Sequence, residues 1–306
     1  MRILVTGGAG FIASHVVDAY INEGHEVSVI DNLSTGSRDN LNPRTRFYQA
    51  DIRDDISSLI KDIKPEIINH HAAQINVRAS VEDPAADAAV NIIGTLKIIQ
   101  AGLNNGVRKI IFASSGGAVY GEQDYFPADE SHPARPLSPY GVSKLTCEKY
   151  LYYYRCNFGL DYISLRYSNV YGPRQNPFGE AGVVAVFAHR LITGEQPVIN
   201  GDGQQTRDFV YIDDVVKANM KALEIGDSGE FNISTATETS VNELFNNFIE
   251  ISGKKLDAFY GPAKKGEQQR SCLSYKKAKD ILGWTPSVPI SEGLKNTVKW
   301  FLENTK

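Results

Sequence analysis

Two residues with the types and spacing for proton transfer, Tyr140 and Lys144, follow Ser138-Pro139, a pair that favours a helix start. Residues four apart share one face of a helix, so the lysine ammonium would lie beside the tyrosine hydroxyl. A free phenol has a pKa near 10 and is a poor base at neutral pH, but a neighbouring cation lowers that pKa. The pair therefore predicts a general base. A solvated helix face is the alternative that the spacing leaves open.

Two adjacent hydroxyl side chains, Ser114 and Ser115, end an apolar run that predicts a strand over 109–114. Open α/β sheets bind ligands beyond the carboxyl ends of their strands. A serine hydroxyl at this edge could bridge a substrate oxygen and the phenolate. The sequence leaves open which serine does so, and we favour Ser115.

A glycine-rich turn, Thr6-Gly7-Gly8-Ala9-Gly10-Phe11-Ile12-Ala13, joins the first predicted strand to the first predicted helix. Gly7 would permit the tight turn, and Gly10 would let the backbone approach a pyrophosphate at the helix N-terminus. Ala13 stands where a third glycine is common, and a small residue suffices there. The turn therefore predicts a dinucleotide site.

Two carboxylates lie at predicted strand ends near this turn. Asp31 ends the second strand, where a carboxylate suits ribose hydroxyls and would repel a 2′-phosphate, so we expect NAD rather than NADP. Asp51 follows the next strand-like run. It is either an adenine contact or an ordinary exposed strand end, and its spacing does not decide between them.

Short apolar runs alternate with helix-length amphipathic segments over the first 165 residues. The predicted strands cover 2–6, 26–31, 66–72, 109–114 and 162–166, and the predicted helices 11–23, 56–63, 85–104 and 143–157. This alternation predicts an α/β fold with a Rossmann-type doubly wound parallel sheet. After about residue 172 glycine and proline cluster and the alternation becomes irregular. We expect an NAD-binding domain over 1–171 and a smaller mixed α/β substrate-binding region over 172–306, with the segment near 206–225 a candidate to return to the first domain.

The composition of the 306 residues, 42% hydrophobic and 22% charged, excludes global disorder, and a net charge of −4 offers no basic face for nucleic acid. The longest apolar run, 183–188, is too short to span a membrane, and the N-terminus reads as a strand rather than a signal peptide. Three cysteines, Cys147, Cys156 and Cys272, have neither disulfide-framework nor metal-site spacing. We expect a reduced, cytoplasmic compartment and no metal.

Seven motifs, taken in order along the chain, resemble those of the extended short-chain dehydrogenase/reductase family. They are the glycine turn, Asp31-Asn32-Leu33-Ser34, His71-Ala72-Ala73-Gln74, Ser114-Ser115-Gly116-Gly117-Ala118-Val119-Tyr120-Gly121, Tyr140-x-x-x-Lys144, Arg166-Tyr167-Ser168-Asn169-Val170-Tyr171-Gly172-Pro173-Arg174 and Arg207-Asp208-Phe209-Val210. Within that family they are similar to the UDP-glucose (UDP-galactose) 4-epimerases, and the likeness covers essentially the whole chain. Three features depart from the family pattern: Ala13, His71 where Leu is common, and a serine loop lengthened by Gly116-Gly117.

The resemblance implies NAD-dependent epimerisation at C4 of a UDP-hexose, through a transient 4-keto sugar. It implies that Tyr140 removes the O4 proton, Lys144 tunes Tyr140 and binds the nicotinamide ribose, and Ser115 relays the proton. The implied cofactor-binding residues are Gly7, Gly10, Phe11, Ile12, Asp31, Asn32, Ser34, Gly36, Asp51, Ile52, Ala72, Ala73, Gln74, Asn91, Tyr140, Lys144 and Tyr167. The implied substrate-binding residues are Ser115, Tyr140, Asn169, Val183, Val184, Arg207, Lys265, Glu267 and Ser271.

Two of these implied roles bear on the substrate. Arg207 would bind the diphosphate, since a guanidinium pairs bidentately with phosphate oxygens; the alternative is a surface ion pair with Asp208 or Asp213. Ser271 would lie beside the C2 substituent of the sugar. Because it is small, the resemblance implies room for the N-acetylated pair of UDP-hexoses as well as UDP-glucose.

Other activities of the family are weighed by the same motifs. A UDP-uronate 4-epimerase performs the same chemistry at C4 and stays open. A 4,6-dehydratase would carry an acidic pair just after the catalytic hydroxyl, where this chain has Gly116-Gly117. A non-catalytic NAD-binding relative would commonly lack the Tyr140–Lys144 pair.

The predicted helices over 85–104 and 143–157 carry more apolar residues than one sheet-facing stripe needs. These residues are Ala88, Ala89, Ile92, Ile93, Leu96 and Ile99 on the first helix and Leu151, Tyr152 and Tyr154 on the second. A second apolar face on surface helices indicates an interface. Relatives pair such helices in a two-fold bundle, so we expect a homodimer; deeper burial within one chain is the alternative.

Overall fold

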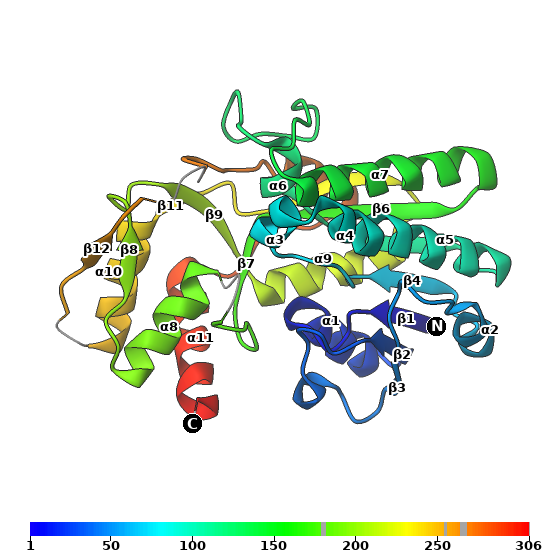
Figure 1. Ribbon diagram of the computed structural model, residues 1–306, viewed down its shortest axis with the longest axis horizontal. Coiled ribbons are helices and arrows are strands. Elements are labelled where there is room, and N and C mark those ends of the chain that lie inside the picture. Colours follow the sequence, from blue (N-terminus) through cyan, green and yellow to red (C-terminus); the bar gives the residue numbers. More distant parts are fainter. Residues whose placement is uncertain (179–181, 254–255, 264–267, 306) are drawn as a thin grey trace.

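A seven-stranded parallel sheet forms the larger part of the molecule in the computed structural model, which describes residues 1–178, 182–253, 256–263 and 268–305 (Figure 1). In spatial order the strands are β10 (Gly229–Ile233), β6 (Asp161–Tyr167), β5 (Lys109–Ser115), β4 (Ile67–His70), β1 (Arg2–Thr6), β2 (Glu26–Asp31) and β3 (Arg46–Gln49). Every pairing in this sheet is parallel. The doubly wound Rossmann-type fold predicted from the alternation of segments is confirmed.

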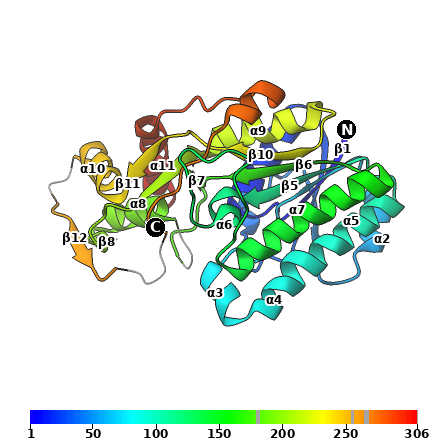
Figure 2. The same cartoon turned by 90° about the horizontal axis from the view of Figure 1, so that it is seen from above.

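Helices cover both faces of the large sheet (Figure 2). One layer holds α1 (Phe11–Asn22) and α9 (Ile212–Glu224); the other holds α2 (Ser57–Ile63), α4 (Pro84–Ala88), α5 (Thr95–Asn104) and α7 (Pro139–Phe158). Successive side chains of a strand point to opposite faces. Accordingly Ile3 and Val5 join the buried cluster under α1, whereas Leu4 joins the cluster under α5 and α7. Burial on both faces is the reason that these strands read as continuous apolar runs.

The sheet reverses its winding between β1 and β4. From β1 the chain proceeds outward to β2 and β3, and from β4 it proceeds the other way to β5 and β6. Such a switch point opens a crevice beyond the carboxyl ends of the two strands. The glycine turn follows β1, His71 follows β4 and Ser115 ends β5. The topology therefore gathers the predicted cofactor and catalytic motifs at one edge.

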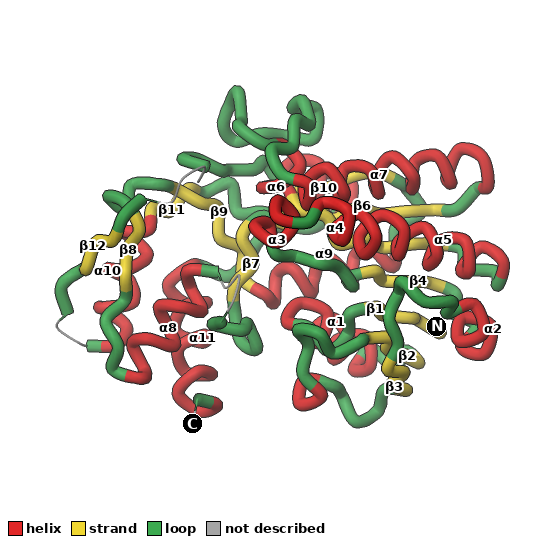
Figure 3. Tube along the Cα trace, viewed as in Figure 1, coloured by secondary structure: helices red, strands yellow, loops and turns green. Residues whose placement is uncertain are grey.

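A smaller part of the molecule extends from this edge (Figure 3). Its sheets are β11 (Glu238–Ser240), β9 (Thr206–Tyr211) and β7 (Asn169–Tyr171), and β12 (Phe259–Gly261) with β8 (Val198–Asn200); its helices are α8 (Val183–Thr193), α10 (Val241–Ser252) and α11 (Ile290–Asn304). The chain crosses between the parts repeatedly. After β9, α9 packs on α1 and β10 pairs with β6, before β11 re-enters the smaller sheet. The segment that lies on the large sheet is thus 212–233, and a single division at residue 171 remains an expectation.

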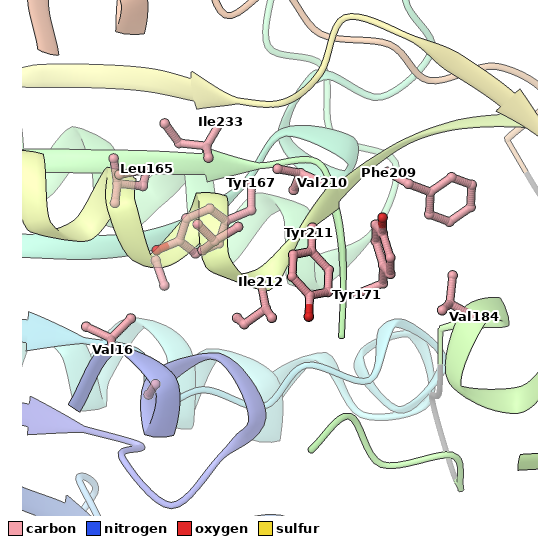
Figure 4. Packing of buried hydrophobic residues seen from close by; sticks show 14 of the residues in the cluster. Val16, Leu165, Tyr167, Tyr171, Val184, Phe209, Val210, Tyr211, Ile212 and Ile233 are labelled. Carbon is pink, nitrogen blue, oxygen red and sulfur yellow. The ribbon is translucent and has the colours of Figure 1, made fainter. Parts of the chain in front are cut away.

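Aromatic side chains fill the junction between the two parts (Figure 4). Tyr171 lies 5.4 Å from Tyr211 and 6.3 Å from Phe209 between ring centroids, and all three are buried. Val184 and Ile212 belong to the same cluster, which continues to α1 of the large sheet. The two parts therefore share one apolar core.

Two predicted helices differ from those observed. The segment 85–104 is helical throughout but is not a regular α-helix: α4 continues into a π-helix (Ala89–Gly94) and then into α5, with right-handed helical dihedral angles at both junctions. The π-helix turns Asn91 into the buried interface with α7, which regular helical periodicity does not encode. The helical segment given as 143–157 extends back to Pro139, the start that the Ser138-Pro139 pair indicated, because Ser138 caps the helix through the Gly141 backbone.

Shorter elements complete the described chain. They are a 3₁₀ turn (Arg38–Asn40), α3 (Val77–Glu82), α6 (Gly116–Tyr120) and a π-helical turn (Ala278–Leu282). Among the described residues no helix has the length and apolarity needed to cross a membrane. The same residues contain no cluster of metal-ligating side chains, and the three cysteines are free thiols.

Candidate active site

The glycine turn forms a tight backbone loop at the N-terminus of α1. Gly7 has a φ of +72°, and a Cβ there would lie 2.7 Å from the Ala72 backbone nitrogen, so only glycine fits. Gly10 is the N-cap and offers no side-chain cap, and the first turn of α1 carries no acidic residue. The backbone N–H groups at this helix end therefore remain available to an anion.

Asp31 fixes the loop from the end of β2. Its carboxylate accepts hydrogen bonds from the Ala9 nitrogen at 3.0 Å and the Leu33 nitrogen at 2.8 Å, and its side chain is buried. Gly36 lies across the turn, since a Cβ there would stand 2.9 Å from the Ala9 carbonyl carbon. These contacts place a carboxylate next to the phosphate-binding turn, as ribose recognition requires.

The predicted adenine-side residues lie beyond Asp31. Asn32 accepts from the Ser34 nitrogen and donates to Asp51 at 2.9 Å. Asp51 also forms an ion pair with Arg53 at 2.9 Å, whose hydrogen bonds lower the pKa of the carboxyl. Ile52 is buried against Gly94. Asp51 therefore has two local partners, Asn32 and Arg53, at the end of its segment.

The three groups predicted to perform catalysis meet where β5 ends. Ser115 caps α6 and accepts from the Ala118 nitrogen at 3.4 Å, and its side chain lies close enough to the phenol of Tyr140 to lower the pKa of that phenol. The Lys144 ammonium lies 5.7 Å from the centre of the Tyr140 ring and donates to the Ala113 carbonyl at 2.8 Å. The geometry matches a hydroxyl, a phenol and a cation that act on one reacting oxygen.

Ser114 faces the other way. Its hydroxyl donates to Glu148 at 2.7 Å, on the face of β5 that α7 covers. Glu148 also forms a buried ion pair with Arg166, with N–O distances of 2.6 and 2.9 Å. The structure brings Ser115, rather than Ser114, to Tyr140, and it assigns Ser114 to the network that joins β5, β6 and α7.

A close approach between α6 and α7 sets the position of Tyr140. A Cβ at Gly141 would lie 2.4 Å from the Ala118 carbonyl oxygen, so the two helices could not approach as they do with any other residue. The Tyr140 nitrogen donates to Ser80 at 3.2 Å. The sequence shows Gly141 inside the Tyr-x-x-x-Lys motif but not its role, because the contact joins separate segments.

In the ligand-free chain the pKa of Tyr140 is raised and the pKa of Lys144 is lowered, so both shifts disfavour the pair of a phenolate and an ammonium. Burial and the nearby Asp87 carboxylate raise the pKa of Tyr140, and the neighbouring Ser115 side chain opposes the rise only in part. Burial lowers the pKa of Lys144 to about 8, although Cys147, Asp87 and Glu148 favour its charge. Without a bound ligand these groups therefore favour the neutral phenol of Tyr140. A second cation at the site is needed.

Asp87 is a buried carboxylate that the sequence argument missed. Ser143 of α7 donates to it at 2.6 Å, Asn91 at 2.9 Å and Gln74 at 3.0 Å. Asn91 further exchanges two hydrogen bonds of 2.9 Å with the Gln74 backbone. Two predicted cofactor-side residues are thus held against the catalytic helix by one acidic group. The i, i+4 spacing of Asp87 and Asn91 was the available signal.

A buried histidine links the same network to the glycine turn. His70 meets Thr6 at 2.6 Å through Nδ1 and Thr95 at 2.8 Å through Nε2. Because the Thr95 hydroxyl donates to the Asn91 carbonyl, Nε2 carries the hydrogen and Nδ1 accepts. Burial lowers the pKa of His70 to about 3, so the ring is neutral. Its two hydrogen bonds give His70 a structural role, since they join β4 to Thr6 and to α5.

Tyr167 and His71 stack beneath the crevice, with ring centroids 6.2 Å apart. The Tyr167 hydroxyl accepts from Asn219 at 2.9 Å, inside a buried amide–phenol network that includes Tyr20 and Asn69. Tyr167 is 5% exposed, so its phenol faces α9 rather than the crevice. Any contact of Tyr167 with a cofactor must therefore come from its ring edge or backbone.

The predicted substrate residues lie on the smaller part, across from Tyr140. Asn169 is exposed on β7, and Arg207 is half-buried on the paired strand β9, where its guanidinium donates to the Thr206 carbonyl at 2.7 Å. Ser271 is buried, and a Cβ at Gly117 would lie 3.9 Å from its hydroxyl. Ser271 thus lies against the serine loop that carries Ser115.

The other predicted site residues within the described ranges lie at or near the ends of α1, β4 and α8. Phe11 and Ile12 begin α1 and are partly buried, Ala72 and Ala73 follow β4, Val183 is half-buried at the start of α8, and Val184 is buried in the junction core. Lys265 and Glu267 lie outside the described residues.

Comparisons with known proteins agree with this architecture. A family model described as the NAD dependent epimerase/dehydratase family matches residues 3–234. A Thermotoga maritima UDP-glucose 4-epimerase, solved with UDP-glucose, is 49% identical with a TM-score of 0.98, and the match covers 100% of both chains. A Thermus thermophilus UDP-glucose 4-epimerase, solved with NAD, is 41% identical with a TM-score of 0.94 over 100% of both chains. A Methanobrevibacter ruminantium UDP-N-acetylglucosamine 4-epimerase, solved with UDP-N-acetylmuramic acid, is 37% identical with a TM-score of 0.94 over 99% of both.

Proposed function

The chain belongs to the NAD-dependent epimerase/dehydratase family, and we propose that it interconverts UDP-glucose and UDP-galactose by epimerisation at C4. The observation that carries the proposal is the convergence of Ser115, Tyr140 and Lys144 at the carboxyl edge of a sheet whose glycine turn suits a dinucleotide. The full-length likeness to UDP-glucose 4-epimerases supports the choice of reaction.

The residues present fit NAD. The backbone N–H groups of the turn and the uncapped N-terminus of α1 would hold the pyrophosphate, and Asp31 would hold a ribose. Lys144 would bind the nicotinamide ribose, beside Gln74 and Asn91. When bound, NAD supplies the hydride acceptor and donor for C4 and a positive charge beside the phenol. That charge is the second cation which the pKa of Tyr140 requires.

Tyr140 then performs the proton transfers at O4. As phenolate it takes the O4 proton, directly or through the hydroxyl of Ser115, while C4 is oxidised to the ketone. The 4-keto sugar turns about its diphosphate link and is reduced on its other face, and Tyr140 returns the proton to O4. A positioned general base of this kind contributes about 10²–10⁴-fold to the rate. Lys144, as the protonated ammonium, stabilises the phenolate of Tyr140.

The substrate would lie between the catalytic edge and the smaller part. We propose that Arg207 pairs with the diphosphate and that Asn169 contacts it from the adjacent strand. Ser271 would border the sugar at C2, and its small side chain leaves room for an N-acetyl group. The likeness to a UDP-N-acetylglucosamine 4-epimerase supports activity on the N-acetylated pair as well.

Incubation with UDP-glucose, UDP-N-acetylglucosamine and UDP-glucuronate, each without added cofactor, tests the proposal. Formation of UDP-galactose is expected. Conversion of UDP-glucuronate alone would favour the uronate epimerase, and the absence of any C4 epimer would overturn the assignment.

We further propose a homodimer in a reduced cytoplasmic compartment. Ile93, Tyr152, Val142 and Tyr153 are exposed on the outer layer formed by the π-helix and α7, which contact each other. By contrast Ile99, Leu151 and Tyr154 of the expected apolar face are buried within the chain. Exposed apolar and aromatic side chains on neighbouring surface helices support a partner surface. The three free thiols support the compartment. A monomeric mass by light scattering would refute the dimer.

A further inference from the structure

One buried carboxylate, Asp208 on β9, gathers segments that are far apart in the sequence. Its Oδ1 accepts from the nitrogen and the hydroxyl of Thr235, both at 2.8 Å. Its Oδ2 accepts from the nitrogens of Ala236 at 3.0 Å and Leu273 at 3.3 Å. The Ser168 hydroxyl donates to Oδ1 at 3.4 Å. Asp208 is 1% exposed, so these bonds form away from water.

Asp208 itself and two of its partners, Ser168 and Leu273, lie close in the sequence to predicted substrate residues, whereas Thr235 and Ala236 anchor the carboxylate from the segment after β10. Arg207 precedes Asp208 itself, Asn169 follows Ser168, and Ser271 stands two residues before Leu273. The three substrate residues come from β9, from the junction of β6 and β7, and from the segment after 268. The last of these segments is held to β9 on either side of Ser271: the Thr206 nitrogen donates to the Gln269 carbonyl at 2.9 Å, and the Leu273 nitrogen donates to Asp208 at 3.3 Å.

From this arrangement we infer that Asp208 is a positioning residue of the nucleotide-sugar site. Strand pairing sets β7 beside β9, and the bonds to Asp208 add a buried side-chain link from the strand of Arg207 to Ser168, next to Asn169, and to Leu273, near Ser271. This inference rests on the function proposed above. Asp208 does not touch the reacting atoms; it acts through the segments that it joins. Its loss should weaken substrate binding and leave cofactor binding intact, since the glycine turn and Asp31 lie on the large sheet.

The ionised form of Asp208 is what the arrangement needs. Both oxygens accept from donors, so an amide or a protonated carboxyl would set an N–H or O–H against a backbone N–H. Burial raises the pKa of Asp208 to about 6, against the hydrogen bonds from Thr235. The site should therefore loosen as the pH falls through about 6.

Other titratable groups near Asp208 do not change charge in that range. The Cys272 thiol, 3.9 Å from Oδ2, has a pKa raised to about 12 by burial, so it stays neutral. Glu238, on the paired strand β11, forms an ion pair with Arg270 at 2.6 Å, whose hydrogen bonds lower the pKa of the Glu238 carboxyl. A change in substrate binding near pH 6 would therefore report Asp208.

The test compares Asp208→Asn with wild type in the purified, NAD-containing protein. We expect the KM for UDP-glucose and the Kd for UDP to rise about tenfold or more, with kcat within about threefold and NAD retention unchanged, because a buried acceptor of several bonds is replaced by a donor. The wild-type KM should rise below about pH 6. The variant should lack this pH dependence.

A matched control is Asp214→Asn on α9. Asp214 is a second buried carboxylate; it accepts from the nitrogen and hydroxyl of Ser287 and from the Val288 nitrogen, at 2.7–2.9 Å. None of its partners lies beside a predicted substrate residue. The control should lower stability without changing the KM for UDP-glucose.

A milder variant guards against misfolding of Asp208→Asn. Thr235→Val removes one donor to Oδ1 and should raise KM by a smaller factor at unchanged kcat. An unchanged KM in both variants, or an equal rise in Asp214→Asn, overturns the inference about Asp208. Failure of wild type to bind UDP or to form UDP-galactose would instead overturn the proposed function.

Discussion

Replacing the buried ammonium of Lys144 by the similar volume of methionine should stabilise the protein while removing its activity. Burial lowers the pKa of Lys144 from 10.5 to about 8. At neutral pH the charged form is therefore disfavoured in the folded chain by about 3 kcal/mol, at about 1.4 kcal/mol for each pKa unit. Loss of the hydrogen bond to the Ala113 carbonyl destabilises the folded variant by about 1 kcal/mol and offsets part of this gain. The net expected gain for Lys144→Met at pH 7 is about 2 kcal/mol.

The pH dependence of stability independently checks the sign of the change expected for Lys144→Met. The folded chain binds fewer protons than the unfolded chain between the two pKa values, so the penalty is full below about pH 8 and is relieved as the pH rises toward 10.5. Urea unfolding of the cofactor-free protein at about pH 7 and about pH 9.5 measures the free energy of unfolding at the two pH values. The exposed substitution Lys295→Met is the control. The difference in free energy of unfolding between wild type and Lys144→Met should be smaller at the higher pH. A variant that is less stable at pH 7, or a gap that does not change with pH, would refute the reasoning.

Four further outcomes are expected. Tyr140→Phe should lower kcat by about 10²–10⁴-fold with little change in UDP binding, and near-normal turnover would exclude Tyr140 as the base. Gly141→Ala places a Cβ 2.4 Å from the Ala118 carbonyl, so kcat should fall by about tenfold or more while NAD titration stays normal; unchanged kcat would contradict the close approach. Asp31→Ala should abolish the preference for NAD over NADP in a binding titration, which a wild type preferring NADP would contradict. Ser271→Tyr should lose turnover of UDP-N-acetylglucosamine but keep that of UDP-glucose; equal handling of both sugars would show that Ser271 is not the gate.

Elements that obey a local period are predictable from this sequence. The inner strands are buried on both faces and read as apolar runs, and the glycine turn shows its spacing directly. The π-helical segment within the helix over 85–104 was not predictable, because it turns Asn91 toward Asp87 and α7 through contacts between separate segments. The helix start at Pro139 was recoverable from Ser138 as its cap.

The candidate site divides in the same way. Residue types and spacing predicted Tyr140 and Lys144, and the alternate directions of neighbouring strand residues explain why Ser115 rather than Ser114 meets the phenol. The pKa of Tyr140 could not be predicted, because burial and Asp87 set it. Residues that act by joining distant segments, such as Asp208, carry no local signal of their partners.

The central claim is that one bound NAD serves both the oxidation and the reduction at C4 while Tyr140 moves only the O4 proton. It is tested by incubating the purified protein, without added cofactor, with UDP-glucose that carries deuterium at C4. We expect UDP-galactose with the deuterium retained at C4 and none exchanged with solvent. UDP-galactose that has lost the label to water, or turnover only when NAD is supplied in proportion to product, would contradict it.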